Sequence, residues 1–240
     1  MAGFTAVREE MTKRVKVIAC PVVLEELSLR LPTTGVDTQA LDMGLHTNPD
    51  RLRAALQEAV DNSEPGLDAV VLGYGLCSKA VVGVVARHCR LVVPRVDDCI
   101  CLFLGSRRAH REQLRVEPGT YYLTKGWVDA GDGPFAEYDR MCERWGSERA
   151  DRLMGVLLKH YTRLAFIRTG RAEDLSPYRR HARETAARFG LRYEELDGST
   201  ALLEKLARGP WDDEFVVVPP GEAVPFEPFC SVSEGRPGPP

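Results

Sequence analysis

The sequence predicts an α/β protein with a parallel-sheet, Rossmann-like first half and a second, smaller α/β half packed against it. Short apolar runs alternate with amphipathic segments along most of the 240 residues. Within these runs the apolar residues are continuous, which is typical of parallel strands that are covered by helices on both faces. A third observation is that the same strand–helix rhythm returns after a turn-rich segment at 129–134.

Four apolar runs predict the strands of the first half. They lie at 15–19, 38–43, 68–73 and 90–94, and helices are predicted at 21–31, 49–60, 75–88 and 107–115. The clearest helix start is Asn48, a residue type that favours the N-cap, followed by Pro49 at the first helical position. An extended segment or loop over 119–127 completes this half.

The second half begins with two predicted helices and returns to strands. The predicted elements are helices at 135–145, 147–161, 176–189 and 202–207, and strands at 164–169, 192–196 and 215–218. We therefore divide the chain into a first α/β half over 1–128, a second over 135–221 and a Pro/Gly-rich tail over 222–240. That composition is typical of disorder, which we expect for the tail.

Composition and charge exclude several classes of partner. The net charge of −3 and the pI near 6.0 argue against nucleic acid, whose binding requires a strongly basic surface. No apolar run approaches the roughly 20 residues that span a bilayer, so no membrane association is expected. The charged first residues do not resemble a signal peptide, which predicts a cytoplasmic protein.

Seven scattered cysteines are the most informative feature of the composition. An odd number of thiols without a CxxC pair does not predict a disulfide framework or a zinc ribbon, and a reducing compartment favours metal binding or reactivity instead. The cysteines are Cys20, Cys77, Cys89, Cys99, Cys101, Cys142 and Cys230.

Reactive residues follow each of the first four predicted strands. They are Cys20, His46, Cys77 and the pair Asp98–Cys99. Because the carboxyl ends of parallel strands meet at one edge of a sheet, these side chains are predicted to lie together there.

Three thiols and an imidazole suit a thiophilic metal, so we predict a centre held by Cys20, His46, Cys77 and Cys99. Zinc is the first expectation, and iron or an iron–sulfur cluster is the alternative. Asp98 is the predicted catalytic residue, as a support for the site or a proton carrier. The competing interpretation is that each cysteine simply packs as a small hydrophobe.

A partial nucleotide-binding motif overlaps this site. Gly73 and Gly75 begin a GxGxxS segment between a predicted strand and a predicted helix, which resembles the dinucleotide fingerprint apart from its third glycine. A nucleotide- or dinucleotide-binding enzyme is therefore the alternative function. The structural interpretation is that both glycines adopt positive φ in a tight turn.

Two cationic features complete the candidate residues. Arg107 belongs to an arginine cluster near the end of the fourth strand, which either clamps an anionic ligand or forms a solvated helix face. Lys125 lies in the aromatic segment 121–127, which either lines a pocket or packs as a crossover between the halves. Both are predicted as cofactor-binding residues.

Several segments resemble one family of prokaryotic proteins, a domain of unknown function (DUF1638). The matching stretches are ACPVVLEEL at 19–27, LDMGLHTNPDRLRAALQEAVD at 41–61, DAVVLGYGLCSKAVVGVVARH at 68–88, PRVDDCICLFLGSR at 94–107, GTYYLTKGW at 119–127, HYTRLAFIRTG at 160–170 and WDDEFVVVPPG at 211–221. Cys20, His46, Cys77, Asp98 and Cys99 fall inside these blocks, whereas Cys101 stands where the family leads us to expect a different residue.

The resemblance implies a role in one-carbon metabolism, because members of this family are often encoded beside corrinoid-dependent methyltransferases and corrinoid proteins. The expected function is therefore a metal-binding protein associated with corrinoid-dependent methyl transfer. It acts either as an enzyme or as an accessory that carries a metal or cluster to a corrinoid protein or methyltransferase.

Overall fold

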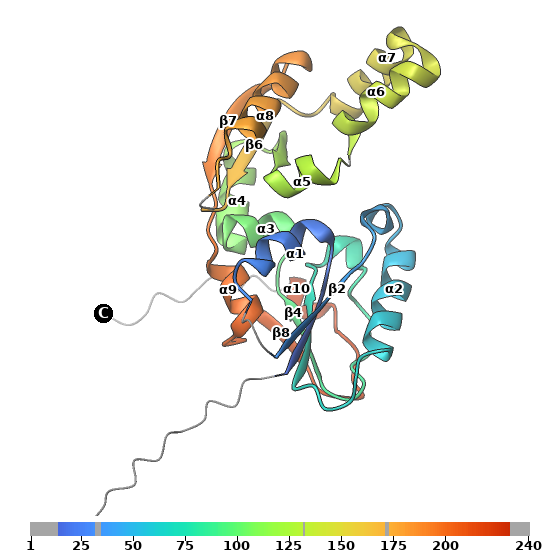
Figure 1. The fold of residues 1–240 in the computed structure, drawn as a ribbon, viewed down its shortest axis with the longest axis vertical. Helices are drawn as coiled ribbons and strands as arrows, with labels where there is room; N and C mark the ends of the chain where they lie inside the picture. Colours follow the sequence, from blue (N-terminus) through green and yellow to red (C-terminus); the bar gives the residue numbers. More distant parts are fainter. Residues whose placement is uncertain (1–13, 32–34, 132, 171–172, 231–240) are drawn as a thin grey trace, which may run out of the picture.

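The computed structural model of the protein describes residues 14–31, 35–131, 133–170 and 173–230. These residues form two sheets that lie one above the other along the long axis of the molecule, with helices packed around both (Figure 1). Sheet A has the strand order β2-β1-β3-β4-β8, and sheet B has the order β5-β6-β7. The predicted α/β fold is confirmed.

Sheet A contains the four strands predicted for the first half. Its strands are β1 (Val15–Ala19), β2 (Val36–Ala40), β3 (Ala69–Gly73), β4 (Arg90–Pro94) and β8 (Phe215–Val218). The first four pair in parallel, and β8 adds an antiparallel edge next to β4. All residues of β1 and β3 are buried, as their continuous apolar sequences require.

Helices and two short 3₁₀ turns connect these strands. They are α1 (Pro21–Ser28), η1 (Met43–Thr47), α2 (Pro49–Asp61), η2 (Cys77–Lys79), α3 (Cys99–Leu104) and α9 (Ala201–Arg208). The predicted cap of α2 is confirmed, because the Asn48 side chain accepts a hydrogen bond from the Arg51 N–H at 3.1 Å.

Sheet B and its helices form the second, smaller unit. The strands β5 (Thr120–Leu123), β6 (Arg163–Arg168) and β7 (Arg192–Asp197) are all parallel. The helices are α4 (Arg107–Val116), α5 (Lys125–Ala130), α6 (Pro134–Trp145), α7 (Ser147–Leu158) and α8 (Ser176–Arg188), of which α6 and α7 project as a hairpin (Figure 1). None of the helices in the described ranges is long and apolar enough to cross a membrane.

The two units share one hydrophobic core. Ala165 and Ile167 of β6 and Leu196 of β7 are buried in the same cluster as the strands of sheet A, and α1 packs against α5. Two strands cross the division that we predict at 128–135: β5 belongs to sheet B, and β8 returns to sheet A. The chain therefore passes from one sheet to the other and back.

The expectation of a disordered tail is wrong for residues 222–230. Val224 and Phe229 are buried, and the segment ends in a short helix, α10 (Glu227–Cys230). The Gly83 N–H donates to the Val224 carbonyl, and the Val224 N–H donates to the Val84 carbonyl, both at 2.9 Å. Residues 231–240 lie outside the described part of the chain.

The helix predicted over 75–88 is also wrong. Its backbone groups are taken by partners from outside the segment: the Gln57 side chain binds both the N–H and the carbonyl of Val85, and residues 221–224 pair with residues 83–86. Gly83 has a φ of +85°, which ends any right-handed helix there. Tertiary partners thus override an apolar pattern that is compatible with a helix.

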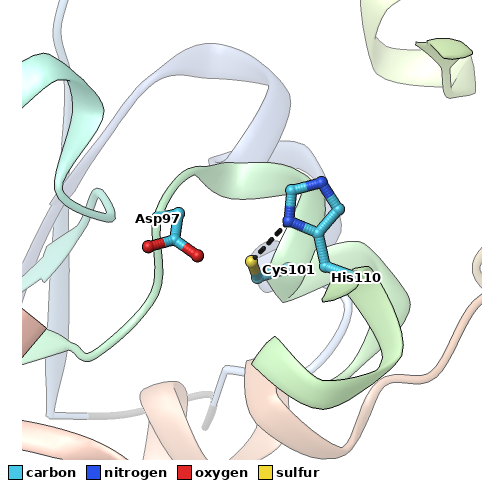
Figure 2. A group of neighbouring side chains, drawn as sticks. All are labelled: Asp97, Cys101 and His110. Carbon is cyan, nitrogen blue, oxygen red and sulfur yellow. Dashed lines mark hydrogen bonds between the residues drawn. The ribbon is translucent and has the colours of Figure 1, made fainter. Parts of the chain in front are cut away.

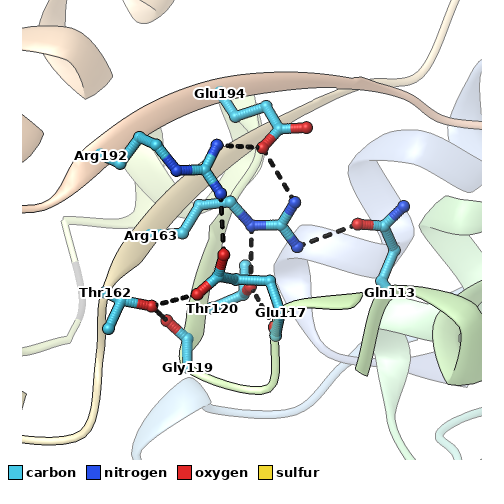
Figure 3. Close-up of polar contacts among 8 residues, drawn as sticks. All are labelled: Gln113, Glu117, Gly119, Thr120, Thr162, Arg163, Arg192 and Glu194. Atoms are coloured by element: carbon cyan, nitrogen blue, oxygen red, sulfur yellow. Dashed lines mark hydrogen bonds and ion pairs between the residues drawn. The ribbon is translucent and has the colours of Figure 1, made fainter. Parts of the chain in front are cut away.

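A buried arginine connects sheet B to α4 (Figure 3). Arg163 is 2% exposed, and its guanidinium donates to Thr120 Oγ1 at 2.9 Å, Gln113 Oε1 at 2.9 Å and Glu194 Oε2 at 3.0 Å. Arg192 joins the same network by donating to Glu194 Oε2 at 2.7 Å. A buried charge costs little only when it is paired in this way, so this network holds β5, β6, β7 and α4 in one arrangement.

Candidate functional site: a cysteine-rich edge of sheet A

The carboxyl edge of sheet A collects three of the predicted ligands. Cys20 follows β1 and begins α1, Cys77 follows β3, and Cys99 follows β4 as the first residue of α3. Backbone hydrogen bonds bring the last two segments together, because the Leu76 N–H donates to the Val96 carbonyl at 2.8 Å and the Cys77 N–H donates to the Asp97 carbonyl at 3.1 Å. The parallel sheet is the reason that these distant residues meet.

Cys77 lies in an unusual left-handed turn. Cys77, Ser78 and Lys79 have φ values of 43°, 56° and 70°, although none of them is glycine. Such conformations cost on the order of 1–3 kcal/mol each and are found mostly at functional sites. The turn is held from α2, where Arg53 Nη2 donates to the Lys79 carbonyl at 3.1 Å.

Tyr74 lies at the centre of this edge. Its side chain is 1% exposed, and its hydroxyl oxygen is buried without a hydrogen-bond partner among the described residues. Leaving a buried hydroxyl unsatisfied costs about 1–3 kcal/mol, so the group calls for a physical explanation. The ring of His46 lies beside it, with the two ring centroids 5.7 Å apart.

The three thiols are electrostatically coupled to one another and to Tyr74. Desolvation, together with charge on Asp98 and on Cys20, raises the pKa of Cys77 to about 12. Desolvation also raises the pKa of Cys99, with added contributions from Cys20 and Cys77. Desolvation likewise raises the pKa of Tyr74, and charge on the three cysteines contributes to that shift. The thiols are therefore close enough to interact, and without a cation among them they are protonated at neutral pH.

The spacing of these sulfur atoms bears on the kind of centre that they can hold. The ligand atoms of Cys20, Cys77 and Cys99 do not all lie within 4.8 Å of one another. A tetrahedral zinc ion with Zn–S bonds of about 2.3 Å holds its sulfur ligands less than about 4 Å apart. An iron–sulfur cluster accepts a wider spacing, because its cysteines bind different iron atoms.

His46 approaches this edge from η1. Its Nδ1 lies 3.0 Å from the Met43 carbonyl oxygen, and the side chain is half-buried. A ligating histidine typically binds through one ring nitrogen while a carbonyl or carboxylate holds the other. The partner of Nδ1 is therefore the Met43 carbonyl, and not one of the carboxylates of Asp97 and Asp98. That the four residues ligate a metal stays a prediction.

A second group of potential ligands comes from the β4–α3 loop and from the two helices that follow it, α3 and α4 (Figure 2). Within the described residues, the Asp97 carboxylate, Cys101 Sγ and His110 Nδ1 lie within 4.8 Å of one another, and Cys101 and His110 are buried. Cys101 Sγ is 3.2 Å from His110 Nδ1, and burial raises the pKa of Cys101 to about 12, with Asp98 adding to the effect. This Asp97–Cys101–His110 group can hold a metal ion.

The sequence places His110 in the cationic cluster near the end of the fourth strand, but it does not predict the contact with Cys101, because no helix is predicted over 99–104. With α3 in place, the turn at Gly105 and Ser106 brings Cys101 of α3 against His110 of α4. The available signal was the pair Gly105–Ser106: a glycine in the left-handed conformation ends α3, and the Ser106 side chain accepts from the Ala109 N–H at 3.0 Å. A C-terminal glycine followed by an N-cap serine is typical of two consecutive helices.

Asp98 has a structural role at the start of α3. Its carboxylate accepts from the Ile100 N–H at 2.9 Å and so caps α3, and it lies 4.0 Å from His110 Nδ1. An aspartate at an N-cap satisfies an otherwise unpaired helix N–H. The predicted catalytic role of Asp98 stays a prediction.

Gly73 and Gly75 are explained by close packing within the chain. A Cβ on Gly73 would lie 2.5 Å from the Ala19 Cβ, and a Cβ on Gly75 would lie 2.8 Å from the Val96 carbonyl oxygen. Neither glycine has a positive φ, which corrects our expectation for the turn. The helix required by a dinucleotide fingerprint is absent from residues 80–89, all of which the structure describes, so the motif lacks its structural context.

The two predicted cationic residues occupy different places. Arg107 binds both carboxylate oxygens of Asp97, at 2.8 and 3.2 Å. Lys125 begins α5 and forms ion pairs with Glu25 and Asp129, both at 2.5 Å, which raise the pKa of Lys125 above its ordinary value. Lys125 therefore joins α1 to α5, whereas Arg107 contacts the Asp97–Cys101–His110 group directly.

Comparison with known proteins gives one family and no characterised relative. No curated protein matches the chain, and no solved structure does. A family model matches more than half of the chain, including His46, Cys77 and Cys99, while Cys20 precedes the matched segment. The chain belongs to the family described as protein of unknown function (DUF1638), whose model matches residues 40–207.

Proposed function

We propose that this chain is a metalloprotein that carries an iron–sulfur cluster on Cys20, Cys77 and Cys99 at the carboxyl edge of sheet A. The observation that carries the proposal is that three cysteines, each following a different strand, meet at one edge of sheet A and interact electrostatically with buried Tyr74, whose hydroxyl has no hydrogen-bond partner among the described residues. A thiolate or a cluster sulfide next to that hydroxyl would accept its hydrogen bond and remove the cost of burying it.

The spacing of the thiols and the strained turn at Cys77 also support a cluster. The sulfur atoms are spread too widely for one zinc ion as they stand, which changes the order of preference from zinc to the iron–sulfur alternative. Nε2 of His46 is the fourth ligand in this proposal, because Nδ1 already lies against the Met43 carbonyl. Such a cluster supplies electron transfer or a Lewis-acidic iron.

A second candidate is a zinc ion on the Asp97–Cys101–His110 group. It is favoured by the one property that the three-cysteine set lacks, namely ligand atoms within 4.8 Å of one another. Against it, Arg107 already neutralises the Asp97 carboxylate with two hydrogen bonds. With zinc bound, this group would polarise or activate a substrate, and Asp98 would be the nearby proton carrier.

The wider role that we propose is in corrinoid-dependent methyl transfer, in the cytoplasm, either as an enzyme or as an accessory to a corrinoid protein or methyltransferase. Its support is the family resemblance together with the seven free cysteines, which suit a reducing compartment. Anaerobic affinity capture with a purified corrinoid protein as the probe tests this role. Retention of the wild-type protein supports it, and no retention contradicts it.

The ligand assignment is tested by measuring iron, sulfide and zinc per chain after anaerobic reconstitution. Cys20→Ser, Cys77→Ser and Cys99→Ser are each expected to abolish stoichiometric iron and the visible absorption of the cluster. His46→Ala tests the fourth position and is expected to retain the cluster at reduced occupancy, because three thiolates remain. Cys89→Ser, Cys142→Ser and Cys230→Ser are the matched controls and should leave the metal content unchanged.

Two outcomes contradict the cluster proposal. If Cys20→Ser and Cys77→Ser retain full iron, the three-cysteine site does not exist. If the metal is zinc and is lost only in Cys101→Ser and His110→Ala, the Asp97–Cys101–His110 group is the centre instead.

A further inference from the structure

A pocket of about 250 Å³ lies beside the cysteine-rich edge, between the end of β4, the first turns of α4 and the segment that leads into β8. Four arginines line it: Arg95, Arg107, Arg108 and Arg111. Two carboxylate residues, Asp213 and Glu214, also line the pocket, and Glu214 is paired with Lys205. The pocket wall is therefore rich in positive charge even though the protein as a whole has a net charge of −3.

Two of these arginines are fixed in position by the fold. Arg95 donates to the main-chain carbonyls of Asp213 at 2.6 Å and Pro228 at 3.1 Å. Arg107 donates to the Phe229 carbonyl at 2.6 Å in addition to its contacts with Asp97. Guanidinium groups that are oriented before a ligand arrives lose less entropy on binding it.

The other two arginines are available to a ligand. Arg108 and Arg111 are exposed on one face of α4, three residues apart, and neither forms an ion pair with any described residue. By contrast, Arg115 on the same helix pairs with Glu112 at 2.7 Å.

We infer that this pocket binds the oxyanion group, phosphate or carboxylate, of a small ligand. Planar guanidinium groups bind both kinds of oxyanion through paired hydrogen bonds, and the anchored and unpaired arginines together provide orientation and charge. Because Arg107 contacts both the pocket and Asp97, a bound anion lies next to the β4–α3 loop that leads into Cys99 and Cys101 of α3. The inference does not depend on the proposed cluster, since none of these contacts involves a metal ligand of that proposal.

The test is a titration of ¹⁵N-labelled, metal-free protein with inorganic phosphate and, separately, with acetate, at constant pH and ionic strength. The backbone amide signals of Arg107 and Arg108 are expected to shift in a saturable manner with at least one of the two anions. Saturation by phosphate alone assigns the pocket to phosphate groups, and saturation by acetate alone assigns it to carboxylates. Saturation by both leaves the oxyanion class as stated.

Variants locate the binding site. Arg108→Ala combined with Arg111→Ala should weaken binding at least about tenfold, because two charge-assisted contacts are lost. Asp213→Asn should strengthen binding, because a like charge is removed from the wall. The matched control is Arg51→Ala, since Arg51 is another exposed arginine in the first turn of a helix without an ion-pair partner among the described residues, and it should leave the affinity unchanged. The absence of saturable shifts with both anions, or equal weakening by the control, would overturn the inference.

Discussion

Tyr74 provides a direct test of the proposed three-cysteine cluster at the scale of a single residue. Its hydroxyl is buried, has no hydrogen-bond partner among the described residues and interacts electrostatically with Cys20, Cys77 and Cys99. In the metal-free protein, Tyr74→Phe removes an unsatisfied group and should raise the free energy of unfolding by about 1 kcal/mol. In the protein that carries the cluster, the same change removes a hydrogen bond and should lower it.

Tyr122→Phe is the matched control for this sign change. The Tyr122 hydroxyl is also buried without a hydrogen-bond partner in the described part of the chain, but its ring packs against His110, with ring centroids 5.9 Å apart. Tyr122→Phe should stabilise the protein with or without the cluster. Denaturant unfolding of both variants, with and without metal, measures the effect. If metal binding reverses the sign of the stability change for Tyr122→Phe but not for Tyr74→Phe, the metal is bound by the Asp97–Cys101–His110 group instead.

For single residues, the sequence predicted which of them lie at strand ends better than it predicted which side chains contact one another. The strand ends at Cys20, Cys77 and Cys99 could be inferred because a parallel sheet fixes where its carboxyl ends lie. The pairing of Cys101 with His110 could not, because it depends on a turn between two short helices. The left-handed conformation at Cys77 also has no sequence signal, since none of its three residues is glycine.

At the scale of elements, strands were predicted more reliably than the segments between them. The strands β1, β3 and β4 are continuous apolar runs, and the pattern itself specifies burial on both faces. Residues 80–89 are equally apolar but form no helix, because their backbone partners come from Gln57 and from residues 221–224. Those partners are distant in sequence, so local periodicity cannot reveal them.

The network around Arg163 predicts a large difference between two neighbouring arginines. Arg163 is buried and makes three side-chain hydrogen bonds. Because Arg163→Ala leaves the hydrogen-bond partners of the guanidinium unsatisfied, it should lower the free energy of unfolding by about 3–5 kcal/mol. The side chain of Arg192 is 54% exposed, and Arg192→Ala should cost no more than about 1 kcal/mol. Urea unfolding of both variants measures this difference, and equal losses would contradict the structural role of Arg163.

Glu194 gives the same network a dependence on pH. Hydrogen bonds from Arg163 and then Arg192 lower the pKa of Glu194 below its ordinary value of 4.5. A carboxylate whose pKa is lower in the folded state stabilises the fold above the unfolded-state pKa, and this contribution is lost as the pH falls through the folded-state value. As the pH falls from neutral to below 4.5, the free energy of unfolding should therefore decrease less for Glu194→Gln than for the wild type. Unfolding measured across this range tests it, and parallel curves would contradict it.

At the scale of the whole molecule, the chain closes sheet A with residues from near its far end. The strand β8 pairs with β4, and the segment after it supplies buried Val224 and Phe229 and the carbonyl that Arg107 binds. Sequence patterns predicted two α/β halves, but they could not reveal this return, because residues 222–230 contain two prolines and run into the Pro/Gly-rich end of the sequence, which resembles a disordered tail.

Phe229→Ala tests the importance of this closing segment. Because Phe229 is 2% exposed, its truncation should lower the free energy of unfolding by about 3–5 kcal/mol. Phe226→Ala is the matched control, since Phe226 is only half-buried and packs under Lys79 Nζ at 4.6 Å, and it should cost clearly less. A negligible effect of Phe229→Ala would mean that residues 222–230 do not contribute to the fold.

X-ray absorption at the K edge of the metal bound to the wild-type protein distinguishes a cluster on three cysteines from a single metal ion. A cluster requires iron with a shell dominated by sulfur at about 2.3 Å and a further shell of neighbouring iron atoms, because sulfides and thiolates hold several irons together. A single zinc ion with one sulfur neighbour and otherwise nitrogen and oxygen would contradict the cluster and would assign the metal to Asp97, Cys101 and His110.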